Sequence, residues 1–183
     1  PHRLSINGIY EFPFGKGKRF MSDASGFVEG LVGGWQIQGV YTFQSGFPVR
    51  FGTDAFYNGT DPIDGSDIAL DDKSTKKWIN TDVFTSILTG TSTLATPVDH
   101  LRSLPFRFDG VRADTINNMD LSLIKNVAFA NGMRLELRAE FINAFNNPYL
   151  ATGDGQIGVN PTTSTFGQIT ASNQQNYARR GQL

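Results

Sequence analysis

The charged residues with the clearest spacing for chemistry stand at alternate positions of one short segment. They are Arg134, Glu136, Arg138 and Glu140. Carboxylates beside guanidinium groups can act as general acids, general bases or anion ligands. Consecutive same-face residues of a strand lie about 6.6 Å apart, so this row predicts a ladder of charges more readily than a converging catalytic site.

The rest of the chain offers little material for catalysis or metal binding. There is no cysteine, and neither His2 nor His100 stands four residues from a second ligand. The Gly15–Lys18 stretch lacks the spacing of a phosphate-binding loop and is interpreted as a turn. We therefore expect no enzyme activity, no cofactor and no metal site.

An acidic stretch at 54–72 raises the question of a calcium site. Its carboxylates are Asp54, Asp61, Asp64, Asp67, Asp71 and Asp72. Calcium-binding loops of the EF-hand type need alternating oxygen ligands, and this spacing does not supply them. A solvated extracellular loop is the interpretation we adopt.

Composition favours a membrane β-barrel over a water-soluble domain. Only 18% of residues are charged, while the chain holds 20 glycines, 15 phenylalanines and 12% aromatic residues. Turn glycines, uncharged polar loops and aromatic girdles are typical of such barrels. A net charge of -1 gives no electrostatic footprint for nucleic acid. No apolar run reaches about 18 residues, which excludes a transmembrane helix but not barrel strands.

The clearest predicted strand begins at Met133, where apolar and charged residues alternate to Phe141. Strict period 2 over this length predicts a strand with one apolar and one charged face. A second alternating run lies at 118–124, and Asn131-Gly132 between the runs predicts a tight hairpin turn. In a barrel the apolar row would face lipid, while a solvated sheet of a soluble protein would give the same alternation.

Two further segments, near 3–13 and 34–50, carry aromatic residues at the ends of apolar rows. Trp35 and Phe43 stand eight positions apart, and Tyr10 and Phe12 close the first strand. This spacing fits two interfacial girdles across an apolar band of about 25 Å. Ordinary core aromatics are the alternative.

The connections between the strands differ greatly in length. Residues 53–117 form a long predicted loop, and 146–165 form a second. Long loops are extracellular in outer-membrane barrels and periplasmic turns are short, so the Asn131-Gly132 turn and the C-terminus are predicted to be periplasmic. The exception is 14–33, an unusually long periplasmic turn with a short predicted helix at 26–32.

These patterns predict an all-β fold, an antiparallel meander of about five strands from a larger transmembrane barrel. The strands are expected near 3–13, 34–50, 118–129, 133–145 and 166–183. Predicted lumen-facing residues are Arg134, Glu136, Arg138, Glu140, Gln36 and Gln38. Predicted lipid-facing or girdle residues are Tyr10, Phe12, Trp35, Tyr41, Phe43, Leu135, Leu137 and Phe141.

The chain resembles the Oar-like TonB-dependent outer-membrane transporters that are abundant in acidobacteria. Six segments carry this resemblance in order, and together they cover nearly the whole chain. They are Pro1–Phe20, Gly33–Gly39 with Gln44–Pro48, Lys77–Phe84, Asn118–Asn126, Leu137–Pro148 and Phe166–Ile169.

The resemblance implies that residues 1–183 are the C-terminal part of a longer protein with a carboxypeptidase-regulatory-like domain, a plug and a barrel of about 22 strands. It implies partners in outer-membrane lipid, in the protein's own plug and remaining barrel, and in an inner-membrane TonB-type energy complex reached through N-terminal regions. The chain departs from the family by lacking a final aromatic residue. With no signal peptide or initial Met, we interpret it as a fragment or a processed product.

The expected function is therefore to form pore wall and substrate-contacting loops for active uptake or export of a large solute across the bacterial outer membrane. The alternative is a secreted or surface β-sheet module that binds copies of itself through its strand edges, because five strands cannot close a barrel alone. The sequence names no substrate.

Overall fold

The computed structural model describes residues 2–52, 57–60, 63–84, 101–102, 104–129, 132–151, 155–170 and 178–183. The chain divides into two compact units. The sheet unit comprises His2–Gln44, Asn117–Pro148 and Tyr177–Leu183, and the loop unit comprises Pro1, Ser45–Ile116 and Tyr149–Asn176. Among the described residues, no helix is both long enough and apolar enough to cross a membrane.

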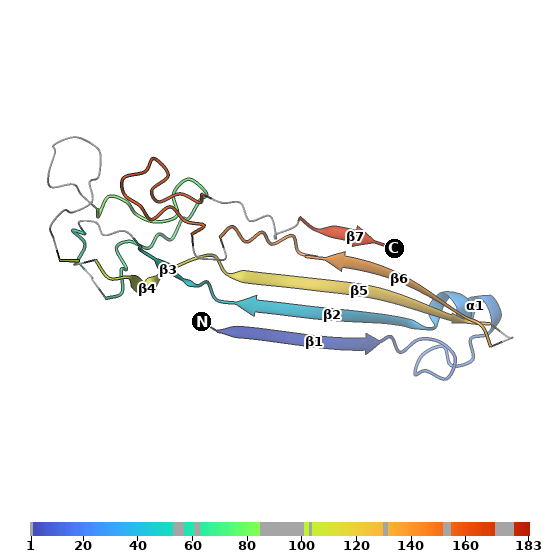
Figure 1. Cartoon of the computed structure of the whole chain (residues 1–183). Coiled ribbons are helices and arrows are strands. Elements are labelled where there is room, and N and C mark those ends of the chain that lie inside the picture. The colour runs from blue at the N-terminus through green and yellow to red at the C-terminus, as the bar shows by residue number, and fades with distance from the viewer. Residues whose placement is uncertain are drawn as a thin grey trace. The chain divides into compact units, whose positions relative to one another are not determined.

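The sheet unit is built on one five-stranded sheet of order β1-β2-β5-β6-β7 (Figure 1). The strands are β1 (Arg3–Glu11), β2 (Trp35–Gln44), β5 (Ile116–Ala128), β6 (Arg134–Ile142) and β7 (Arg180–Gln182). Each strand of this sheet is followed along the chain by its neighbour in the sheet, except that the two short strands of the loop unit come between β2 and β5. The predicted all-β antiparallel meander is confirmed.

Antiparallel pairing fixes which residues share a face. Ile6 pairs with Tyr41 in β1 and β2, and Leu121 pairs with Phe141 in β5 and β6. Between β2 and β5, the Asn126 amide donates to the Gly34 carbonyl at 2.9 Å. Gly34 has φ +68°, and a Cβ there would stand 2.1 Å from the Asn126 oxygen, so only glycine allows this close approach.

The long connection between β1 and β2 folds on itself and contains the predicted short helix, α1 (Gly26–Val32). The Trp35 indole N–H donates to the Leu31 carbonyl at 2.8 Å, which attaches α1 to the sheet. The Glu29 carboxylate accepts from the Lys16 amide at 2.6 Å, which attaches α1 to the preceding part of the connection. The helix is thus fixed beside the first residue of β2.

The predicted strand at 34–50 is wrong as a single element. β2 ends at Gln44, and β3 (Pro48–Arg50) pairs with β4 (Arg107–Arg112) in a separate two-stranded sheet. Between β2 and β3, a Cβ at Gly46 would stand 1.9 Å from the Ala113 carbonyl oxygen. The alternation of side chains predicts a strand that continues through Gly46. In the structure, the close approach of the Ala113 backbone to this glycine ends the strand.

The C-terminal predicted strands are also shorter than expected. β6 ends at Ile142 because Asn143 adopts φ +51°, which is incompatible with strand backbone. The predicted strand at 166–183 is wrong at its start: Phe166 and Ile169 pack on the core of the loop unit, and only Arg180–Gln182 forms β7. Residues 171–177 lie outside the described residues. In the predicted turn at 131–132, Asn131 also lies outside the described residues, and Gly132 has φ +78°.

The described residues of the predicted long loop at 53–117 include β4 and much of a hydrophobic core. Its buried side chains come from segments far apart in the chain. They are Val49, Phe51, Ile68, Trp78, Ile79, Phe84, Leu104, Phe108, Val111, Ala113, Ala151 and Ile157. Apolar residues that appear isolated along the sequence meet in this core, so the loop unit is a folded element in its own right.

Candidate functional site

The charged row of β6 forms the ladder that its spacing predicts. Arg138 donates to Glu136 at 3.0 Å and lies 3.5 Å from a Glu140 oxygen. The other Glu140 oxygen accepts from the side-chain amide Nε2 of Gln182 in β7 at 2.5 Å. Each carboxylate is thus paired along or across strands, and the four charges do not converge on a single point as a catalytic centre would require.

This polar face extends across the sheet through the register of the strands. In β5, Ser122 pairs with Glu140, and Asn126 pairs with Glu136. In β2, Gln36 and Gln38 pair with Glu11 and Ile9 of β1. By strand alternation, the structure brings all six predicted lumen-facing residues to one face of one sheet.

The opposite face is apolar and largely uncovered. Ile6 is 54% exposed and Leu137 is 56% exposed. The same face also exposes Leu4, Tyr10, Leu135 and Phe141. A continuous apolar sheet face of this kind is unusual for a soluble monomer, whose exposed apolar residues are scattered.

The predicted aromatic residues lie at both ends of this apolar face. Near the α1 end, the Tyr10 and Phe12 rings meet edge to face with centroids 5.6 Å apart, and the Phe12 amide donates to the Trp35 carbonyl at 2.9 Å. At the other end, Tyr41 and Phe43 pair with Ile6 and Leu4. The eight residues predicted as lipid-facing therefore share one face, with aromatic rings at both of its ends.

Sequence analysis missed Lys125, which lies on the apolar face of β5. It pairs with Leu137 and is only 6% exposed. Its ammonium donates to the Gly33 carbonyl and stands 5.2 Å from the centre of the Trp35 ring. A lysine on an apolar face can be accommodated when its stem directs the charge towards polar atoms at the edge of that face. The signal was present as a break in alternation at 119–127, where a cation occupies an apolar position.

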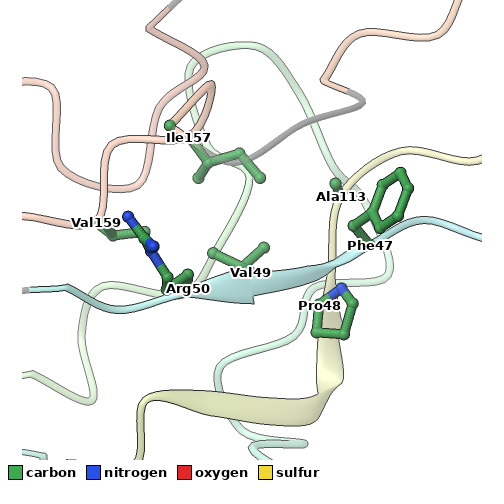
Figure 2. Close-up of a pocket in the computed structure, with 8 residues that line it drawn as sticks. Phe47, Pro48, Val49, Arg50, Ala113, Ile157 and Val159 are labelled. Carbon is green, nitrogen blue, oxygen red and sulfur yellow. The ribbon is translucent and has the colours of Figure 1, made fainter. Parts of the chain in front are cut away.

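The loop unit contains a second candidate, a pocket beside β3 (Figure 2). It is lined by Phe47, Pro48, Val49, Arg50, Ala113, Gly155, Ile157 and Val159. The Arg50 side chain points towards Val159, and Ile157 lies on the same side of β3 (Figure 2). The pocket volume is about 10 Å³, roughly the room needed by one water molecule, so it cannot hold an organic solute.

The acidic stretch is partly structural. Asp67 accepts from the Tyr57 hydroxyl at 2.5 Å and from the Thr60 amide at 2.7 Å. Burial acts to raise the pKa of Asp67, but these bonds, with those from its own amide and that of Ile68, outweigh burial and lower the pKa below its ordinary 3.8. The solvated loop predicted at 54–72 is therefore fixed at Asp67. Within the described ranges, no three His, Asp or Glu side chains gather as a metal site requires.

Residues 1–182 match the protein-family model described as outer membrane beta barrel domain. No curated protein and no solved structure matches the chain.

Proposed function

The chain belongs to the outer membrane beta barrel domain family and forms part of a barrel wall in the bacterial outer membrane, and we propose that this barrel is an Oar-like TonB-dependent transporter. One observation carries the proposal: a single sheet presents a continuous apolar face and, opposite it, a polar face with the ladder from Glu136 to Glu140. In a barrel wall the first face contacts lipid and the second lines the lumen.

The proposed division of roles follows from solvation. Side chains such as Ile6 and Leu137 contact the hydrocarbon of the outer membrane, where their exposure costs nothing. Girdle residues such as Trp35 and Tyr41 lie at the two interfaces. Paired charges on β6 lie in the hydrated lumen, where Arg138 and its two carboxylates give polar contacts to a plug or a passing solute.

The folded loop unit favours a transporter over a passive barrel whose strands are joined only by short turns. It is built mainly from the connection that follows β2 and the connection that follows β6, and it has its own core. A folded loop element can hold side chains in fixed positions for contact with a large solute, which short flexible loops cannot do. In this proposal the chain supplies wall and recognition surface and performs no catalysis.

The transport proposal predicts dependence on cellular energy. A strain lacking the gene and its parent would be grown in one medium, and depletion of solutes from that medium would be followed by mass spectrometry. We expect at least one solute to be depleted by the parent alone, and a protonophore to abolish that depletion. Depletion that persists with the protonophore, or identical depletion by both strains, would refute energy-coupled transport.

The proposed lumen row has a separate test. Glu136→Lys or Glu140→Lys in the full-length protein places like charges beside Arg138, and we expect weaker plug retention, seen as sensitivity of the cells to a large antibiotic that the outer membrane normally excludes. Lys76→Gln, an exposed change in the loop unit, is the control. Variants that retain both uptake and plug closure would count against a plug-contacting role for this row.

The alternative function is a surface module that self-associates through strand edges. The observation in its favour is that β1, nine residues long, pairs only with β2 among the described strands. An unpaired edge of this length is a template for pairing with another chain. The two functions differ in what contacts the apolar face, water or lipid.

A further inference from the structure

The connection between β1 and β2 exposes apolar side chains in an ordered segment. Phe27 of α1 is 81% exposed, and other large apolar residues of the segment are also exposed. These are Phe14, Phe20, Met21, Val28 and Leu31. The exposure is not that of an unstructured tail, because the Gly15 amide donates to the Phe20 carbonyl at 3.0 Å and the Phe20 amide donates to the Pro13 carbonyl at 2.9 Å.

The helix is amphipathic over its short length. Phe27 and Leu31 stand four residues apart, so they lie on one side of α1, with Val28 beside them. Glu29 points to the opposite side, where its carboxylate accepts from the Lys16 amide. The apolar stripe of α1 therefore faces away from the polar contacts that hold the helix.

The helix is attached on the apolar side of the sheet. Trp35 and Lys125 both belong to the apolar face, and both bind backbone at the end of α1: the indole at the Leu31 carbonyl and the ammonium at the Gly33 carbonyl. The end of α1 that carries Leu31 is thereby held at Trp35, one of the girdle residues.

Three exposed cations precede α1 in the same connection, Lys16, Lys18 and Arg19. The first two lie on the polar side, because the Lys16 amide binds Glu29 and Lys18 pairs at 2.7 Å with Glu11 of the polar face. The Arg19 guanidinium instead stands 5.6 Å from the centre of the Phe20 ring, an exposed apolar side chain. A cation beside exposed apolar side chains matches a surface of anionic phospholipid, which offers phosphate above and hydrocarbon below.

We infer that residues 14–32 form an interfacial anchor that inserts Phe27 and Leu31 into the periplasmic leaflet of the outer membrane and binds an anionic phospholipid headgroup through Arg19. The inference rests on the proposed orientation and lipid contact of the barrel. It accounts for the length of this connection, because a tight turn would suffice to join two antiparallel strands.

Site-directed spin labelling can test the insertion in the full-length protein, reconstituted in vesicles of phosphatidylethanolamine with or without phosphatidylglycerol. The described chain has no native cysteine, so Phe27→Cys places one label on its stripe. Leu137→Cys reports the apolar sheet face and Asn7→Cys the polar face. We expect labels at 27 and 137 to collide more with oxygen, which concentrates in lipid, and the label at 7 to collide more with a water-soluble nickel chelate.

The three labels separate the two proposals. A water-exposed label at 27 together with a lipid-exposed label at 137 would overturn the anchor and leave the barrel wall standing. A water-exposed label at 137 would overturn lipid contact by the sheet itself. Lipid exposure at both positions supports both.

Headgroup binding is tested separately with the variant Arg19→Gln. We expect it to lower the ratio of inserted to water-exposed label at position 27 in phosphatidylglycerol vesicles by about fivefold. In vesicles without phosphatidylglycerol this variant should match the parent, and Lys76→Gln should match it in both. Equal ratios for parent and Arg19→Gln in phosphatidylglycerol vesicles would refute the headgroup contact.

Discussion

A lysine placed on each face of β1 tests which face contacts lipid. Ile6 and Asn7 are adjacent, lie at the middle of a nine-residue strand and point to opposite faces. Both are exposed in the sheet unit, so neither substitution must fit into a packed core. Ile6→Lys and Asn7→Lys each add one positive charge, which makes them a matched pair.

The expected cost at Ile6 depends on the surrounding medium. In lipid, a lysine near the bilayer midplane destabilises a barrel by about 2 to 4 kcal/mol, which lowers the ratio of folded to unfolded protein by about 30-fold to about 700-fold. In water the cost is smaller. Full burial of an isoleucine contributes about 1.5–3 kcal/mol, but Ile6 is 54% exposed, so about 1 kcal/mol is at stake and the lysine stem retains part of it.

The assay is a urea titration of the full-length protein in liposomes, followed by tryptophan fluorescence, with parent and both variants measured under identical conditions. We expect Ile6→Lys to lower the free energy of unfolding by at least 2 kcal/mol. We expect Asn7→Lys to change it by less than about 0.5 kcal/mol, as hydrated surface substitutions do.

Two results would refute the reasoning. If both variants lie within about 1 kcal/mol of the parent, Ile6 faces water, and the self-associating module becomes the better account. If Asn7→Lys is the more destabilising variant, the faces are assigned the wrong way round.

Three further predictions concern the packing of the two units. Gly34→Ala should destabilise the sheet unit by about 2 kcal/mol or more, because its Cβ would meet the Asn126 oxygen at 2.1 Å, whereas Gly8→Ala, with no atom within 4 Å, should be neutral in the same urea titration. Phe108→Ala should cost the loop unit about 3–5 kcal/mol and speed its proteolysis, while Ile63→Ala, at a position 79% exposed, should leave the cleavage rate unchanged. Because the pKa of Asp67 is lower in the folded loop unit than its ordinary 3.8, the carboxylate stabilises that unit above this pH, and the stabilisation is lost as the pH falls through the lowered folded-state value. The protection factor of the Thr60 amide, its intrinsic exchange rate divided by its observed rate at the same pH, should therefore fall in acid, and Asp67→Asn should remove this pH dependence; an unchanged acid response in that variant would contradict the role given to Asp67.

Local patterns in the sequence were enough to predict the sheet. A period of two specifies a strand and its faces because successive side chains of extended backbone point to opposite sides. This is why the alternation at 133–141 and 35–43 predicted β6 and β2, and why residues 26–32, between glycines, could be predicted as a short helix. The charged ladder from Arg134 to Glu140 follows from the same geometry.

Contacts between distant segments decided the rest. Gly46 ends β2 because the Ala113 backbone lies against it, and Phe166 leaves the last strand because it packs against the core of the loop unit. Lys125 is buried because Gly33 and Trp35, about ninety residues earlier in the chain, supply its partners. Periodicity reports only which face a side chain occupies. What covers that face depends on packing between segments that the sequence keeps apart, and only the tertiary structure brings them together.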